Sequence, residues 1–167
     1  MSVLTRVALV AAGFAVVASP AFAVDAKYRV EDKAITADGV WKAIGDFCGI
    51  ANWHPAVAKC ELGERDGAKI RTLTLAGGGG TIVEKLVEWD DAKHSYTYAI
   101  LEPGPLPVAN YTSTLSTKED DDGGAGIKWT GKFDAAAGAT DEAAKEAIEG
   151  VYKAGVDALF AKVKSGS

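Results

Sequence analysis

Clusters of lysine and arginine are absent from this sequence. Its 18 basic residues are outnumbered by 23 acidic residues, and the formal net charge is −5 at pH 7. Proteins that bind nucleic acids neutralise phosphates with grouped Lys and Arg side chains. The charge pattern therefore argues against a nucleic acid as a partner of this protein.

An apolar run long enough to span a bilayer is also absent. Residues 7–18 are apolar, but as a helix they would rise only about 18 Å, against the roughly 30 Å of a hydrocarbon core. Arg6 precedes the run, and Ala21-Phe22-Ala23 follows it with the small-x-small pattern of a cleavage site. This pattern predicts a secretory signal peptide over residues 1–23, and its length disfavours the alternative of a retained membrane anchor.

Cleavage after Ala23 would leave a mature chain, residues 24–167, without a membrane span. Its 144 residues are enough to bury the core of one domain. Arg6 is the only charged residue of the leader, so the net charge of the mature chain becomes −6. The predicted location is the periplasm.

Motifs that hold phosphate or calcium are missing as well. The glycine run at 76–80 lacks the Lys-Ser/Thr of a P-loop and precedes a strand, which indicates a flexible hairpin turn. The acidic stretch at 118–124 lacks the alternating ligands and distant Glu of a calcium loop, which indicates a solvated turn. We expect no cofactor.

The apolar residues that are present predict a strand, short helices, six strands and a long helix. A first strand is expected over 27–34, then a short amphipathic helix capped by Thr36, and a break before Pro55. Strands separated by Gly, Asp and Pro are expected over 56–62, 69–75, 81–89, 95–101, 111–117 and 126–133. Their short connections predict an antiparallel sheet. A final helix over 140–163, capped by Thr140, carries an apolar stripe that can cover the sheet.

This order resembles the helix-grip fold of the START/Bet v 1-like (SRPBCC) superfamily, and more closely its polyketide cyclase/dehydrase-type branch. The segments that carry the resemblance are "VWKAIGDF" (40–47), "NWHP" (52–55), "CELG" (60–63), "IRTLTLAGGGGTIVEKLVEWD" (70–90), "YTYAILEPGPLPVANYTSTL" (96–115) and "IKWTGKF" (127–133). The resemblance implies an α+β fold: a curved antiparallel sheet of about seven strands wrapped around a long C-terminal helix, with two short helices after the first strand. It also implies a ligand cavity between sheet and helix, with the proline-rich segment 102–110 as a lid.

The two cysteines, Cys48 and Cys60, flank a stretch that contains His54. The spacing C-x5-H-x5-C is wider than the C-x2-C pairs of structural zinc sites and lacks a fourth ligand, so no metal site is predicted. An oxidising periplasm favours a Cys48–Cys60 disulfide, which would contribute about 3 kcal/mol through the unfolded state. Two buried thiols are the alternative, and geometry decides between the two.

The resemblance places Trp53 and His54 near the cavity, as candidates for ligand binding. A catalytic base needs an orienting partner and a nucleophile within reach, and neither is evident for His54, so no catalytic residue is predicted. The alternative is a histidine that packs beside Trp53 and hydrogen-bonds locally. Further ligand-binding candidates are the tyrosines at alternate strand positions, Tyr96, Tyr98 and Tyr111.

Strand alternation on either side of the glycine run predicts a charged pair that faces inward. If a tight turn pairs Leu75 with Ile82, then Leu73 lies opposite Glu84, and Arg71 and Glu84 both point into the cavity on a diagonal. A buried charge is costly without a partner, so the two should pair or bind a polar ligand group. The alternative is a bulge in the glycine run that turns Glu84 outward.

These observations predict an exported, non-catalytic protein that binds a small apolar or amphipathic ligand in its cavity. Two alternatives remain open. Export and size also resemble the MxaD-type periplasmic proteins associated with bacterial methanol oxidation, which implies an accessory protein of methanol dehydrogenase or its cytochrome. The second alternative is a cyclase/dehydratase-type enzyme with His54 as acid/base and Glu84 assisting.

Overall fold

A computed structural model describes residues 23–166 of the chain. The predicted signal peptide, apart from its last residue, lies outside the described residues. Across residues 23–166, no helix combines the length and the apolar character needed to cross a bilayer.

The described residues form a seven-stranded antiparallel sheet, two α-helices and two short 3-10 helices. In chain order these are β1 (Val24–Asp32), α1 (Ala37–Ile44), η1 (Gly49–Asn52), β2 (Val57–Arg65), β3 (Ala68–Leu75), η2 (Ala76–Gly78), β4 (Thr81–Asp90), β5 (Ser95–Glu102), β6 (Val108–Glu119), β7 (Ala125–Ala135) and α2 (Asp141–Ser165). This is the predicted α+β helix-grip fold, with α1 and η1 as the two short helices after the first strand.

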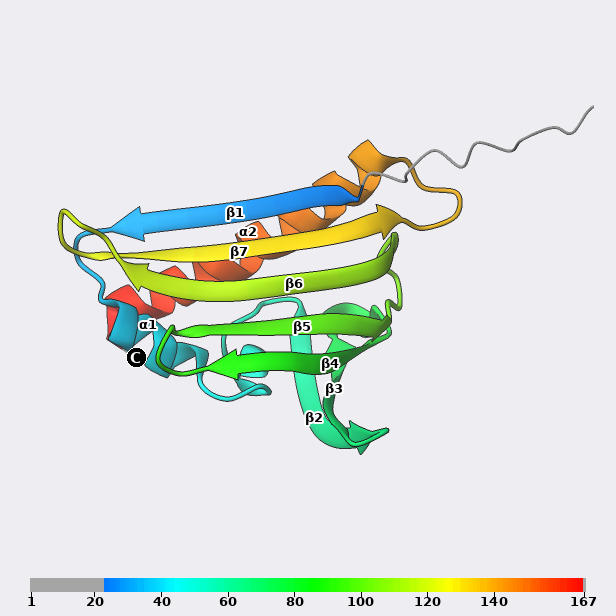
Figure 1. Ribbon diagram of the computed structural model, residues 1–167, viewed down its shortest axis with the longest axis horizontal. Coiled ribbons are helices and arrows are strands. Elements are labelled where there is room, and N and C mark those ends of the chain that lie inside the picture. The colour runs from blue at the N-terminus through cyan, green and yellow to red at the C-terminus, as the bar shows by residue number, and fades with distance from the viewer. Residues whose placement is uncertain (1–22, 167) are drawn as a thin grey trace, which may run out of the picture.

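The sheet has the strand order β1-β7-β6-β5-β4-β3-β2, so the first strand lies beside the last. In Figure 1, α2 runs along one face of the sheet, behind β1, β7 and β6, and α1 lies at one end. The β2–β3 hairpin bends away from the other strands. The long helix therefore covers the half of the sheet that contains β1, β7 and β6.

The position of α2 follows from its sequence. The hydroxyl of Thr140 accepts a hydrogen bond from the Ala143 amide (3.2 Å), as expected of an N-cap, and Asp141 and Glu142 suit the positive end of the helix. The residues buried against the sheet recur every three or four positions: Ala144, Ile148, Tyr152, Gly155, Val156 and Leu159. The predicted stripe ran through Ala144, Ile148, Val151, Gly155 and Leu159, and it agrees except at Val151, which is half-buried. Tyr152 is fully buried at the centre of the observed stripe.

The predicted register between β3 and β4 is wrong by two residues. Leu73 lies opposite Ile82, and Arg71 lies directly opposite Glu84. The turn has the expected length but lies one residue earlier in the chain, because the last pair of the ladder is Thr74 with Thr81. Leu75 leaves the ladder with β4 and lies opposite Val57 of β2. A shift of two residues keeps every side chain on its own face of the sheet, so the inward direction of Arg71 and Glu84 is unchanged.

Candidate functional site

A cavity of about 100 Å³ lies between α2 and the curved part of the sheet. It is lined mainly by aliphatic and aromatic side chains from eight elements and two loops: Ile50, His54, Ala56, Val57, Leu73, Leu75, Ile82, Glu84, Tyr98, Ile100, Leu106, Tyr111, Trp129, Ile148 and Val151. Ala56 is exposed, and Leu75 and Leu106 are half-buried. We therefore place the mouth between the start of β2, the end of β3 and the proline-rich β5–β6 loop.

Arg71 and Glu84 form a buried ion pair at the wall of this cavity. Both side chains are almost fully buried, and the Arg71 Nε–H donates to Glu84 Oε2 at 2.5 Å. The guanidinium does not form a two-pronged pair, because its Nη1 donates instead to the backbone carbonyl of Phe47 (2.5 Å). Its Nη2 has no hydrogen-bond partner among the described residues, and its Cζ lies 4.2 Å from the centroid of the Phe47 ring.

This geometry leaves one carboxylate oxygen, Glu84 Oε1, without a hydrogen bond among residues 23–166. Burial raises the pKa of Glu84, and the charge of Arg71 offsets part of that increase. Glu84 lines the cavity, whereas Arg71 lies behind it and is not a lining residue. Of the two charged residues, the one that lines the cavity is therefore the hydrogen-bond acceptor, Glu84.

A chain of hydrogen-bonded hydroxyl groups runs from two cavity-lining tyrosines, Tyr98 and Tyr111, to Tyr152 and Ser113, which do not line the cavity. Tyr98 Oη lies 3.3 Å from Tyr111 Oη, which lies 2.5 Å from Tyr152 Oη, and Tyr152 Oη lies 3.1 Å from Ser113 Oγ. Ser113 donates to the Thr130 carbonyl at 2.7 Å. Burial raises the pKa values of Tyr98 and Tyr111 well above their usual range, so both hydroxyls stay protonated at neutral pH.

The Tyr152 hydroxyl reaches this network because the residue of β7 that it packs against is a glycine, Gly131. A Cβ at Gly131 would lie 2.1 Å from Tyr152 Oη, which is too close for any pair of non-bonded atoms. Gly155 of α2 has a similar role, since a Cβ there would lie 2.5 Å from His54 and 2.8 Å from Trp129. Both glycines thus provide the close approach of helix and sheet on which the cavity wall depends.

His54 is held by backbone groups on both sides of its ring. The Ala56 amide donates to Nδ1 at 3.1 Å, so Nε2 carries the hydrogen and donates to the Val151 carbonyl at 3.1 Å. Burial lowers the pKa of His54, an effect that the bond to Val151 only partly offsets. The neutral ring therefore fastens the loop before β2 to α2 and has no free nitrogen for a substrate.

The other predicted ligand-binding residues divide between the cavity wall and the core. Tyr98 and Tyr111 line the cavity. Trp53 is buried but lies outside the lining, where its indole N–H donates to the Ile44 carbonyl at 3.3 Å. Tyr96 is also outside the lining and stacks on Trp89 at 5.2 Å between ring centroids. Direct ligand contact stays a prediction for all seven residues, and four of them line the cavity: His54, Glu84, Tyr98 and Tyr111.

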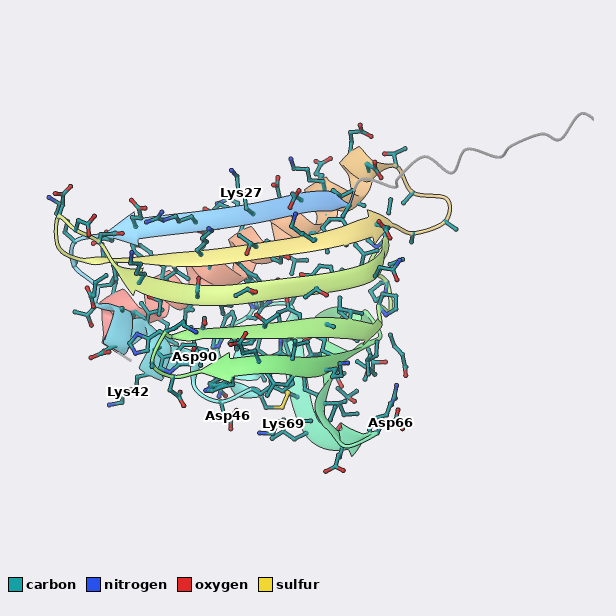
Figure 2. All side chains as sticks on the ribbon, viewed as in Figure 1. Lys27, Lys42, Asp46, Asp66, Lys69 and Asp90 are labelled. Atoms are coloured by element: carbon teal, nitrogen blue, oxygen red, sulfur yellow. A yellow bond between two sulfur atoms is a disulfide. The ribbon has the colours of Figure 1, made fainter. Side chains whose placement is uncertain are left out.

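A disulfide joins Cys48 and Cys60, whose Cα atoms are 5.5 Å apart (Figure 2). The bond ties the start of η1 to β2 and closes the loop that contains Ile50 and His54. Both of these residues line the cavity. The disulfide therefore constrains one wall of the site, and it removes the two thiolates that a metal site would need.

Two members of the hydroxyl network, Tyr152 and Ser113, were not predicted as site residues. The apolar stripe indicated that Tyr152 faces the sheet, but it does not show which group forms a hydrogen bond with the Tyr152 hydroxyl. Tyr111, Ser113 and Leu115 occupy every second position of β6 and lie on its buried face. This spacing could have identified Ser113 as an inward-facing residue.

Comparison with known proteins agrees with this architecture. The family described as "Polyketide cyclase / dehydrase and lipid transport" matches residues 25–164. No curated protein matches the chain. Among solved structures, the protein XoxI from Bacillus cereus is 31% identical with a TM-score of 0.73, and the match covers 81% of this chain and 92% of XoxI.

Two further structures extend the likeness. An uncharacterised protein from Bacillus thuringiensis is 31% identical with a TM-score of 0.70, over 81% of this chain and 95% of its own. The Zhui aromatase/cyclase from Streptomyces sp. R1128 is 22% identical with a TM-score of 0.67, over 84% of this chain and 93% of its own. The last likeness concerns the fold alone.

Proposed function

We propose that this chain, which belongs to the polyketide cyclase/dehydrase and lipid transport family, binds a small, mainly apolar ligand in the cavity between α2 and the sheet. The observation that carries the proposal is the cavity itself. Protein interiors are usually packed without voids, so an apolar space of about 100 Å³ costs stability unless a ligand fills it. Its size suits a ligand of about five non-hydrogen atoms, since an apolar cavity of roughly 150 Å³ is known to bind benzene.

Binding without catalysis is the form of this function that the site supports best. The one histidine at the cavity has both ring nitrogens engaged by backbone groups. A role for His54 as acid/base would require breaking one of these bonds, so the cyclase/dehydratase alternative has no support from this geometry. That alternative would regain support if His54→Gln abolished turnover of a substrate that the wild-type protein converts.

Export to the periplasm is the second part of the proposal. It is supported by the leader pattern of residues 1–23 and by the Cys48–Cys60 bond, because disulfides persist mainly in oxidising compartments. The accessory role in methanol oxidation remains a prediction from the MxaD-type resemblance. This role would gain support if the protein captured a dehydrogenase or cytochrome from periplasm and if that binding weakened as the salt concentration was raised.

Xenon binding tests whether the cavity accepts an apolar guest. Val151 lines the cavity from α2, so Val151→Phe should fill the space and remove a saturable xenon signal that the wild-type protein gives in ¹²⁹Xe NMR. The matched control is Val87→Phe, because the side chain of Val87 is 53% exposed on β4. We expect the control to bind xenon like the wild-type protein, and equal signals from all three proteins would contradict the proposal.

A further inference from the structure

We infer that the ligand is a small neutral alcohol, that is, a molecule with an apolar body and one hydroxyl group that donates a hydrogen bond to Glu84. This inference rests on the proposed function and specifies the chemistry of its ligand. It rests on which polar hydrogens near the cavity already take part in hydrogen bonds.

The hydroxyl network has only one consistent order of hydrogens. Ser113 has a single hydrogen, and the Thr130 carbonyl takes it, so Tyr152 must donate to Ser113. Tyr111 must then donate to Tyr152, and Tyr98 to Tyr111. Every hydroxyl hydrogen therefore points along the chain toward the sheet backbone, and the cavity meets oxygen lone pairs.

The remaining donors near the wall are committed or out of reach. The Trp129 indole N–H is shared between Ser113 Oγ (2.9 Å) and Tyr98 Oη (3.2 Å). His54 Nε2–H is bound to Val151. The unpartnered Nη2 of Arg71 belongs to a side chain that does not line the cavity. The cavity thus offers acceptors and no free donor among its described lining residues.

The strongest of these acceptors is the carboxylate of Glu84. Its Oε1 is left free because Arg71 uses one nitrogen for Oε2 and turns another to the Phe47 carbonyl. A ligand hydroxyl at Oε1 would complete the carboxylate with a charge-assisted hydrogen bond. An ammonium ligand fits less well, because Arg71 already balances the charge of Glu84 and a second buried cation would be uncompensated.

Two probes of nearly equal shape separate the possibilities: butan-2-ol, which can donate a hydrogen bond, and butan-2-one, which can only accept one. Titration of the intact exported protein, followed by ¹H–¹³C NMR of its methyl and carboxyl resonances, gives both dissociation constants. We expect the alcohol to bind at least about tenfold more tightly than the ketone, because the ketone would face only acceptors. We also expect the carboxyl ¹³C resonance of Glu84 to shift with the alcohol.

Glu84→Gln then assigns the effect to this residue. The amide keeps the shape of the side chain but adds N–H donors, so the preference for alcohol should fall to within about twofold. Glu88→Gln, at an exposed position of the same strand, should keep the wild-type preference. If Glu84→Gln does not fold, the wild-type comparison and the Glu84 carboxyl shift still test the inference.

The outcomes distinguish this inference from the function on which it rests. A ketone that binds wild-type protein as tightly as the alcohol would overturn the inference and leave the proposed function intact. So would a full alcohol preference in folded Glu84→Gln. If neither probe binds and xenon does not bind either, the proposed function itself is overturned.

Discussion

Arg71→Leu is expected to lower the free energy of unfolding by about 3–5 kcal/mol, the usual cost of removing one partner from a buried ion pair. Glu84 would remain in the core without the Nε donor that now lies 2.5 Å from its Oε2. The Phe47 carbonyl would also lose its partner. Urea denaturation followed by circular dichroism measures the loss.

Two variants serve as controls for this experiment. The double variant Arg71→Leu/Glu84→Leu should recover most of the lost stability, because an apolar pair of similar size needs no charge compensation. Arg65→Leu breaks the exposed pair with Glu102 (2.9 Å) and should cost less than about 1 kcal/mol. A double variant as unstable as Arg71→Leu alone would contradict the account of the ion pair.

The loss in Arg71→Leu should also depend on pH. Without the charge of Arg71, the pKa of Glu84 rises further, so the folded state keeps a proton that the unfolded state releases above about pH 4.3. The folded state then binds more protons than the unfolded state, and stability falls as pH rises through this range. We therefore expect a smaller deficit relative to wild type at pH 5 than at pH 8.

Removal of the disulfide by Cys48→Ser/Cys60→Ser is expected to lower the free energy of unfolding by about 3 kcal/mol, because the unfolded chain regains the entropy of an open loop. The bond spans 12 positions in the sequence. Ile50 and His54 lie within the loop and line the cavity, so the variant should also bind xenon more weakly. Thermal unfolding and ¹²⁹Xe NMR on the same samples report the two effects.

Reduction provides the matched test. A thiol reductant should lower the melting temperature of the wild-type protein and leave the double serine variant unchanged. Protein taken directly from periplasm and denatured should show no free thiol. Two titratable thiols in that material would contradict both the bond and its place in the exported protein.

The order of elements and the direction of the charged pair could be predicted from the sequence because both depend on local periodicity. The hydroxyls of Thr36 and Thr140 each accept a hydrogen bond from the backbone amide three positions later, and both helix caps are found as predicted. Alternation within β3 and β4 decides which face Arg71 and Glu84 occupy, whatever the register. The disulfide remained one of two options, because its geometry depends on how η1 meets β2.

Only the tertiary structure decided the register, the free oxygen of Glu84 and the order of hydrogens among the hydroxyls. The register depends on the conformation of the glycine turn, which composition does not specify. Arg71 Nη1 donates a hydrogen bond to the carbonyl of Phe47, which lies 24 positions away in the sequence. Glu84 Oε1 is therefore left without a bond from the guanidinium. The hydroxyl order depends on Ser113 and Tyr152, 39 positions apart. A hydrogen bond requires atoms at about 3 Å, and only the folded chain brings such distant residues to that separation.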